Sequence, residues 1–331
     1  MLELIRVFQA RQILQEAILS FFRQRNYLHL DTPIAVTSPG TEVHLQYFAS
    51  EWLDFRGHRH PLYLRSSPEL HLKQALSMGL ARVFHLGKCF RNGGELSPWH
   101  HPEFTMLEWY ETGISLPAFM QQTEELLRFG AAALEAQGFA TLPLPTHIPR
   151  ISVSEAFSRW AGIELIDHDP DLARKGRAKG FGSVREDDDF ETAYFKILLD
   201  GIEPELERLD AAILYDYPAS QCALARIVDG KAQRFELYLH GVELCNAFDE
   251  LLDPVSNQER IAQSNQQRLQ LGHGAVTEDI DFIAALERGF PACCGNAMGF
   301  DRLLGLLLQE PNLDRVVPFR WNLPYRQLQN P

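Results

Sequence analysis

The chain has 331 residues, of which 45% are hydrophobic and 23% charged, and its formal net charge is −13. This composition is ordinary for a globular protein with one large core or two smaller ones. The acidic charge argues against broad, non-specific nucleic-acid binding, which depends on Lys and Arg neutralising phosphates, although a local basic patch remains compatible with it.

We expect neither a membrane span nor a secretory signal. The chain has no apolar stretch of sufficient length, and its N-terminus lacks the order of basic, apolar and small residues found in signal peptides. The five cysteines are odd in number and contain no C-x-x-C pair, which is typical of reduced cytosolic thiols. We therefore predict a cytoplasmic protein, and we interpret the adjacent Cys293 and Cys294 as small core residues.

In the first half of the chain, apolar spacing predicts a long amphipathic helix over residues 3–25, before a strand-like segment that Pro33 interrupts. A Ser-Pro start predicts a helix over 66–80. Residues 82–90 and 102–110 are expected to form the strands of a hairpin with a long polar loop. A further helix is expected over 114–138.

The second half begins with helical pieces, in which we interpret the acidic run at 186–192 as a solvated helix start and not as a metal site. Strands are expected at 213–218, 233–241 and 242–251, a charged helix near 255–270, and small residues leading into an apolar helix over 292–309. Strand pairs mixed with helices, without regular βαβ alternation, indicate an α+β fold around an antiparallel sheet.

The segment HHPEFTMLEWY places a carboxylate among aromatic residues. Strand alternation puts Glu108 on the same side as Tyr110, while Trp109 belongs to an ordinary packing side. Burying an unpaired carboxylate is costly, so Glu108 requires a cation. Further acids on or near apolar segments are Glu69, Glu236, Glu243 and Glu250. Pairing with surface Arg or Lys explains any one of them best, but the set indicates a binding site.

The segment GVELCNAFDEL has an irregular pattern. Alternation places Asn246, Phe248 and Glu250 on one face and Glu243 on the other. Either a bulge lies between Glu243 and Asn246, or Glu243 faces a different partner.

Two arginines are the candidate counterparts of these acids. Arg91 ends the first hairpin strand, where its planar fork is suited to a phosphate or a carboxylate. Arg302 follows GNAMGFD at a helix start, and a helix N-terminus favours anions. Taken alone, such a Gly-rich joint is more often simple close packing.

Together these segments resemble a known family. F-R-N, a loop and then H-x-P-E-F-T-M-L-E-W-Y resemble motif 2 of the class II aminoacyl-tRNA synthetases, specifically of their lysyl branch. GNAMGFDRL resembles motif 3, and the first helix with LHLDTP resembles motif 1 around Pro33. FELYLHGVELCNAFDEL resembles the lysyl-type segment that supplies carboxylates to metal and substrate. The match runs in order from about residue 5 to residue 310.

The resemblance implies one class II catalytic domain over residues 1–331, an antiparallel sheet flanked by helices, with a helical insertion at about 145–212 between motifs 2 and 3. Because motif 1 begins almost at Met1, we expect no anticodon-binding domain before it. YPASQCALARI and Ala297, where true synthetases usually have Gly, are similar to the truncated branch that ligates (R)-β-lysine to elongation factor P. A methyl group in a pocket is worth ~1–3 kcal/mol of discrimination.

The resemblance also implies roles in an amino-acid pocket. Glu69 and Glu108 would hold the amine nearer the carboxyl group of a diamino acid, and Glu250 with Tyr110 the distal amine. Asn246 and Arg91 would orient the substrate carboxylate. The predicted pocket comprises Glu69, Glu108, Tyr110, Asn246, Phe248, Glu250 and Ala297.

For ATP, the resemblance implies that Arg91 contacts the α-phosphate during in-line displacement, and that Arg91 and Arg302 are the catalytic residues. Phe104 and Arg302 would sandwich the adenine, and His100 would reach the γ-phosphate. Glu236 and Glu243 would carry Mg²⁺. The predicted ATP site comprises Arg91, Glu95, His100, Phe104, Glu236, Glu243 and Arg302.

The chain departs from the family pattern at two places. The family usually has Glu directly after F-R-N, an acid that helps to read the adenine, whereas Gly93 stands here and the nearest acid is Glu95. Ala247 replaces the usual Gly before Phe248.

Three functions remain open on the sequence alone. The first is an ATP-dependent ligase that activates (R)-β-lysine, or a related amino acid, to an aminoacyl-adenylate and transfers it to a lysine of elongation factor P. The second is the same activation with another acceptor, a carrier protein or tRNA, although the expected absence of an anticodon-binding domain and the acidic charge weigh against tRNA. The third is a catalytically silent, amino-acid-binding regulatory paralogue. Motif 1 builds a two-fold interface in this family, so the resemblance implies a homodimer.

Overall fold

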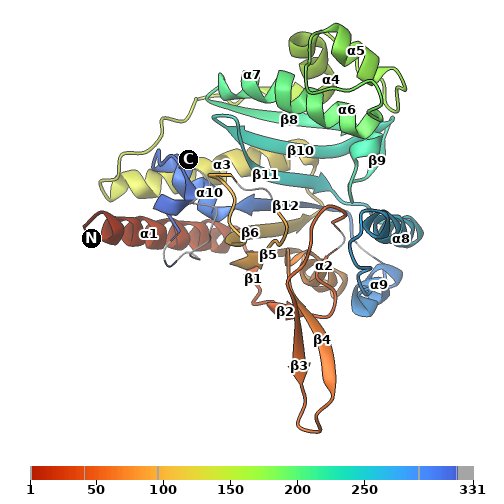
Figure 1. Ribbon diagram of the computed structural model, residues 1–331. Helices are drawn as coiled ribbons and strands as arrows, with labels where there is room; N and C mark the ends of the chain where they lie inside the picture. Colours follow the sequence, from red (N-terminus) through yellow and green to blue (C-terminus); the bar gives the residue numbers. More distant parts are fainter. Residues whose placement is uncertain (1, 41, 95–96, 290, 318, 320–331) are drawn as a thin grey trace, which may run out of the picture.

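The computed structural model describes residues 2–40, 42–94, 97–289, 291–317 and 319. Its large central sheet contains β1 (Leu28–His29), β5 (Arg82–Phe90), β6 (Glu103–Thr112), β7 (Arg150–Ser152), β8 (Ala211–Pro218), β9 (Ile227–Val228), β10 (Lys231–Leu239), β11 (Val242–Asp249) and β12 (Cys293–Gly299). The strand order is β1-β5-β6-β12-β11-β10-β8-β7, and β9 pairs with β10. From β5 along this order to β8, every pair of neighbouring strands is antiparallel. The β1–β5 and β7–β8 pairs at the two ends are parallel. The predicted α+β fold around a mainly antiparallel sheet is confirmed (Figure 1).

The helices surround this sheet (Figure 1). They are α1 (Leu2–Gln24), α2 (Glu69–Ser77), α3 (Leu116–Ala136), α4 (Val153–Ala156), α5 (Leu172–Ala178), α6 (Phe190–Ile197), α7 (Glu203–Glu207), α8 (Pro254–Gln270), α9 (Ile280–Glu287) and α10 (Phe300–Leu307). The long first helix, the hairpin β5–β6 and the strand-to-helix joint β12–α10 all lie where the sequence predicted them. Within the described ranges, no helix has the length and apolar character needed to cross a bilayer.

One face of the sheet forms the main core with α1, α3 and α10. Leu107 and Trp109 of β6 are fully buried there, beside Phe22 of α1 and Phe119 of α3. Burying such side chains contributes roughly 1.5–3 kcal/mol each. The predicted packing side of β6 is therefore confirmed, and the opposite face of the same strands is left for polar side chains.

Helices α4 to α7 lie between β7 and β8 and share a second core with the far end of the sheet. The acidic run begins helix α6, because the Asp189 side chain accepts a hydrogen bond of 2.8 Å from the backbone N–H of Thr192. Asp188 forms an ion pair of 2.7 Å with Lys196. This run is the predicted helix start.

A second sheet was not predicted. It joins β2 (Ala35–Val36), β4 (Arg59–Leu64) and β3 (Ala49–Leu53), and the β3–β4 hairpin projects from the body of the molecule (Figure 1). All five residues of β3 are exposed. With both faces in water, this strand carries no alternation of apolar and polar residues by which it could be recognised.

A bulge in β11 resolves the irregular pattern of GVELCNAFDEL. Leu237 of β10 pairs with Cys245, but the neighbouring Tyr238 pairs with Glu243, so Leu244 is an extra residue. Because directly opposed residues point to the same face, the bulge returns Glu243 to the face that carries Asn246. The first of the two predicted alternatives is confirmed.

Candidate active site

The polar face of the sheet is organised in cross-strand rows. One row contains Glu236, Asn246, Ala297 and Glu108, which pair successively across β10, β11, β12 and β6. The next row contains Arg234, Phe248, Gly295 and Tyr110. Neighbours in such a row have their β-carbons about 4.5–5.5 Å apart and share one face. The structure thus brings the sequence-predicted residues of four strands together on one surface.

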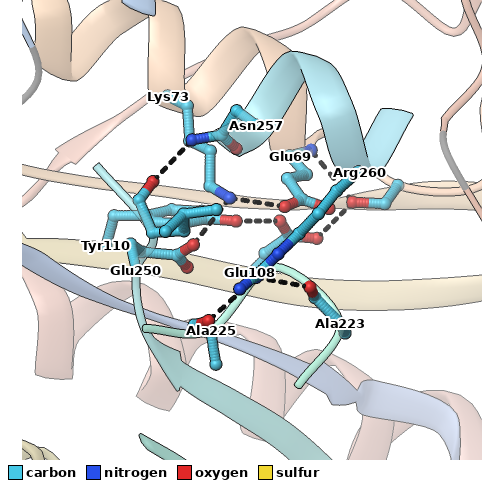
Figure 2. Close-up of polar contacts among 11 residues, drawn as sticks. Glu69, Lys73, Glu108, Tyr110, Ala223, Ala225, Glu250, Asn257 and Arg260 are labelled. Carbon is cyan, nitrogen blue, oxygen red and sulfur yellow. Dashed lines mark hydrogen bonds and ion pairs between the residues drawn. The ribbon is translucent and has the colours of Figure 1, made fainter. Parts of the chain in front are cut away.

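Three carboxylates from separate elements meet above this surface (Figure 2). Glu69 lies in the first turn of α2, Glu108 on β6, and Glu250 directly after β11. The ammonium group of Lys73, one turn after Glu69, lies 2.6 Å from Oε1 of Glu69 and 2.6 Å from Oε2 of Glu250. We refer to Glu69, Lys73, Glu108 and Glu250 as the acid cluster.

Glu108 is buried and its carboxylate is held by two hydroxyl donors. Ser67 donates to Oε2 at 2.6 Å, and Tyr110 donates to Oε1 at 2.8 Å. Ser67 Oγ also accepts from the backbone N–H of Glu69, which ties the acid to the start of α2. Burial and the charge of Glu69 raise the pKa of Glu108 to about 8, although these hydrogen bonds oppose the rise. A cation at this position would restore the ionised form.

Glu250 is the acid with the greatest need for a partner. Its side chain is 1% exposed, and Oε1 has no hydrogen-bond partner within the described part of the chain. Burial raises its pKa to about 7, even though Lys73 lowers it. Gly295 faces this oxygen and the Tyr110 ring so closely that a β-carbon would overlap both. An unsatisfied buried carboxylate oxygen fits the ammonium group of a ligand.

Ala297 lies between the two ends of the predicted amino-acid pocket. It pairs with Asn246 on one side and with Glu108 on the other. Its methyl group therefore stands between the residue predicted to bind the substrate carboxylate and one predicted to bind an amine.

Arg91 and Phe104 of the predicted ATP site lie next to each other. The guanidinium carbon of Arg91 lies 5.2 Å from the centre of the Phe104 ring. Its Nε atom is buried and has no hydrogen-bond partner among the described residues. A buried guanidinium nitrogen without an acceptor fits a phosphate or carboxylate oxygen.

Arg302 lies at the same end of the sheet, beside motif 2. It donates to the carbonyl oxygens of Trp99 at 3.1 Å and Glu243 at 2.7 Å, and its Nη2 lies 2.8 Å from Nε2 of His100. His100 Nδ1 in turn lies 2.6 Å from the hydroxyl of Ser97. These contacts bring His100, Arg302 and Glu243 together. Glu95 lies outside the described residues.

Glu236 and Glu243 supply two carboxylates at this end. Glu236 accepts hydrogen bonds of 2.6 Å from Tyr217 and 2.6 Å from Tyr238. Burial raises the pKa of Glu243, and the charge of Glu236 raises it further, while Arg302 and other arginines lower it. A bound cation would relieve this repulsion, and oxygen donors suit Mg²⁺. Since no group of three or more acidic, His or Cys side chains among the described residues is arranged to hold a metal ion, the fit is to an ion completed by phosphates and water.

Two charged residues of the site were missed by the sequence analysis. Lys73 is one, and Arg234 is the other. Arg234 donates from Nε to Oδ1 of Asn246 at 3.0 Å, forms an ion pair with Glu236, and packs over the Tyr217 ring at 4.3 Å. Its position two residues before Glu236 on a strand placed it on the same face, and this signal was available in the sequence.

Comparisons with known proteins agree with this arrangement. The family model for class II tRNA synthetases (D, K and N) matches residues 2–322. A relative from Vibrio cholerae described as elongation factor P–(R)-β-lysine ligase is 35% identical over 317 residues, which cover 93% of this chain and 93% of the relative. Relatives with the same description are 34% identical in Hamiltonella defensa, over 91% of both chains, and 33% identical in Yersinia pestis, over 95% of this chain and 94% of the relative. The chain therefore belongs to the class II tRNA synthetase family of the D, K and N type.

Proposed function

We propose that this protein is an ATP-dependent ligase that activates (R)-β-lysine and transfers it to a lysine side chain of elongation factor P. The relatives that match over nearly their whole length carry this description. The observation that carries the proposal is the acid cluster: two carboxylates contact one buried ammonium, Glu108 is buried beside them, and Oε1 of Glu250 has no hydrogen-bond partner among the described residues. Two negative charges in excess suit a substrate with two ammonium groups.

The pocket gives each part of the substrate a partner. Glu250 would bind the distal ammonium, and Glu69 with Glu108 the ammonium nearer the carboxyl group. Asn246 accepts at Oδ1 from Arg234, so its N–H₂ group is left to donate to the substrate carboxylate. The ring of Phe248, which pairs with Gly295, forms an apolar wall for the methylene groups between the two amines.

In the first step, a carboxylate oxygen of β-lysine attacks the α-phosphorus of ATP. A new O–P bond forms, the bond to the β-phosphate breaks, and pyrophosphate leaves. Arg91 would bind the α-phosphate and the attacking carboxylate, and thereby stabilise the charge that develops between them. Phe104 and Arg302 would hold the adenine, and His100 the γ-phosphate. Mg²⁺, when bound by Glu236 and Glu243, supplies charge neutralisation to the phosphates.

In the second step, the acceptor amine attacks the acyl carbon of the adenylate. An amide bond forms, AMP leaves, and the proton of the amine passes to solvent. The mixed anhydride is already activated, so no nucleophile of the enzyme is required. The acidic net charge of −13 disfavours tRNA as the acceptor.

We also propose that the protein is a cytoplasmic homodimer, in which each chain forms one catalytic domain. Several apolar side chains of the motif 1 region are exposed in the single chain and are available for a two-fold interface: Leu4, Ile5, Leu28 and Ile34. All five cysteines are free thiols, as in a reducing compartment. Sedimentation equilibrium tests the oligomeric state.

Pyrophosphate exchange tests the activation step. The enzyme is mixed with ATP, Mg²⁺, labelled pyrophosphate and one amino acid at a time. We expect label in ATP with (R)-β-lysine and much less with α-lysine. Purified elongation factor P is then added, and mass spectrometry is expected to find one β-lysyl group on a lysine. Exchange without modification of elongation factor P would point to another acceptor, and absence of exchange with every amino acid would point to a silent paralogue.

A further inference from the structure

The ammonium group of Lys73 lies inside the acid cluster, but neither step of the proposed reaction uses it. The residue is 2% exposed, and Nζ lies 2.6 Å from Oε1 of Glu69 and 2.6 Å from Oε2 of Glu250 (Figure 2). The centre of the Tyr110 ring is 5.8 Å away. Lys73 thus bridges the two carboxylates that the proposed function assigns to different amines of the substrate.

The charge of the cluster depends on this bridge. When every group is ionised, three carboxylates and one ammonium leave two negative charges in excess, which equals the number of ammonium groups on a diamino acid. Without Lys73, three negative charges would lie together, those of Glu108 and Glu250 fully buried, and burial would drive protons onto these two carboxylates. The nearby Arg260 does not replace it, because its guanidinium binds the carbonyl oxygens of Ala223 and Ala225 (Figure 2).

We propose that Lys73 is a positioning residue of the amino-acid pocket: its ammonium group fixes Glu69 and Glu250 and favours the ionised form of Glu250 before the diamino acid binds. The inference rests on the proposed function, because it concerns the affinity of the same pocket. Lys73 leaves Oε1 of Glu250 available, since it contacts the other oxygen of that carboxylate. Lys73 neutralises one of the three carboxylate charges of the pocket, and the two ammonium groups of the substrate neutralise the other two.

The electrostatics of the neighbouring groups support this role. The titratable groups that act on Lys73 or on the carboxylates it bridges are Glu69 on α2, Glu108 and Tyr110 on β6, Glu250 and its neighbour Asp249, which is paired with Arg226, and Cys293 on β12. Burial lowers the pKa of Lys73, but the charges of Glu250 and Glu69 outweigh burial and raise it, so Lys73 stays charged. Lys73 in turn lowers the pKa of both Glu250 and Glu108.

The test compares Lys73→Met with Lys73→Arg. The KM for (R)-β-lysine and kcat are measured by pyrophosphate exchange between pH 6 and pH 9 at saturating ATP. Binding of two ammonium groups requires ionised acids, so the wild-type KM should fall as pH rises through the range in which Glu250 and Glu108 ionise. Loss of a contacting opposite charge raises an acid's pKa by about one to three pH units. In Lys73→Met, we expect the fall of KM with pH to occur at a pH at least about one unit higher than in the wild type. KM at pH 7 should rise about tenfold or more.

The remaining measurements separate charge from packing. Lys73→Arg keeps the charge and should keep the profile near its wild-type position, and kcat at saturating amino acid should change little in either variant. Lys175→Met, which breaks a partly buried ion pair with Asp169 elsewhere, is the matched control and should leave the profile unchanged. Circular dichroism checks folding, and Lys73→Gln replaces Lys73→Met if the latter does not fold.

Each outcome decides a different point. An unshifted profile in the uncharged variant, or a shift of equal size in Lys73→Arg, overturns the role of Lys73 and leaves the proposed function in place. Absence of exchange by the wild-type enzyme with every diamino acid removes the proposed function and this inference together.

Discussion

Gly295 leaves no room for a β-carbon against Oε1 of Glu250 and the ring of Tyr110. The backbone of β12 therefore lies at the floor of the proposed amino-acid pocket, between Phe248 on one side and Tyr110 on the other. A β-carbon at this position would displace the Glu250 carboxylate and the Tyr110 ring, the two groups proposed to hold the distal ammonium.

The first prediction follows from this contact. Gly295→Ala should place a methyl group where the distal ammonium binds, so the KM for (R)-β-lysine should rise at least about tenfold while the KM for ATP changes much less. Pyrophosphate exchange provides both constants. Gly182→Ala is the control, because a β-carbon on Gly182 meets no atom within 4 Å. Equal losses for both substrates would mean that Gly295→Ala disturbs the fold and not the pocket.

The second prediction concerns the charge of Glu250. Glu250→Gln keeps the shape of the side chain but removes the ion pair with a bound ammonium, and a buried pair that loses one partner typically costs about 3–5 kcal/mol. The affinity for diamino acids should therefore fall by several hundredfold or more, and that for ATP should be nearly unchanged. Isothermal titration with each ligand separates the two effects. A comparable loss for ATP would show that the pocket is misassigned.

The third prediction concerns selectivity. Because the Ala297 methyl group lies between Asn246 and Glu108, Ala297→Gly should enlarge the pocket at the position where α- and β-amino acids differ. A methyl group is worth ~1–3 kcal/mol, so the preference for (R)-β-lysine over α-lysine should fall about tenfold or more. The ratio of kcat/KM for the two amino acids measures it, and an unchanged ratio would remove Ala297 from the selectivity of the pocket.

Local patterns in the sequence were sufficient to predict which face of the sheet carries polar side chains and which acids lie on it. Alternation in β6 separated Glu108 from the packing residues Leu107 and Trp109, and the pattern of β11 left two alternatives of which a bulge was one. Lys73 could not be recognised in this way. A Glu–Lys pair one helical turn apart is ordinary on exposed helices, and the second partner of the buried Lys73 ammonium, Glu250, comes from a distant segment. The β3–β4 hairpin was missed because all of β3 and the first half of β4 are exposed, so no alternation of apolar and polar residues predicts these strands.

Arg234 provides the fourth prediction. It donates to Oδ1 of Asn246 and forms an ion pair with Glu236, and it thereby joins the carboxylate end of the pocket to the proposed magnesium ligands. Arg234→Met should let the Asn246 amide rotate and should leave Glu236 without its cation. We expect KM for the amino acid to rise and the Mg²⁺ concentration for half-maximal exchange to change in the same variant. Lys at this position lacks the second donor, so it should restore the charge but not the orientation of Asn246. A defect confined to one ligand would contradict the joint role.

The last prediction uses the raised pKa values of the acid cluster. Burial raises the pKa of Glu108 to about 8 and that of Glu250 to about 7, whereas both ionise near 4.5 in the unfolded chain. Between these values the folded protein binds more protons than the unfolded chain, so the free energy of unfolding should fall as pH rises from 5 to 8. (R)-β-lysine binds the ionised form and should restore more stability at pH 8 than at pH 6.

Glu250→Gln isolates this effect, because the variant lacks one titrating group and other ionisations cancel in the comparison. Thermal unfolding of wild type and variant is recorded from pH 5 to pH 8 without ligand. The wild type should lose stability relative to the variant as pH rises, since only the wild type must place a further negative charge inside the cluster. Parallel curves would show that Glu250 is ionised at every pH in the folded protein, and that Lys73 alone neutralises it.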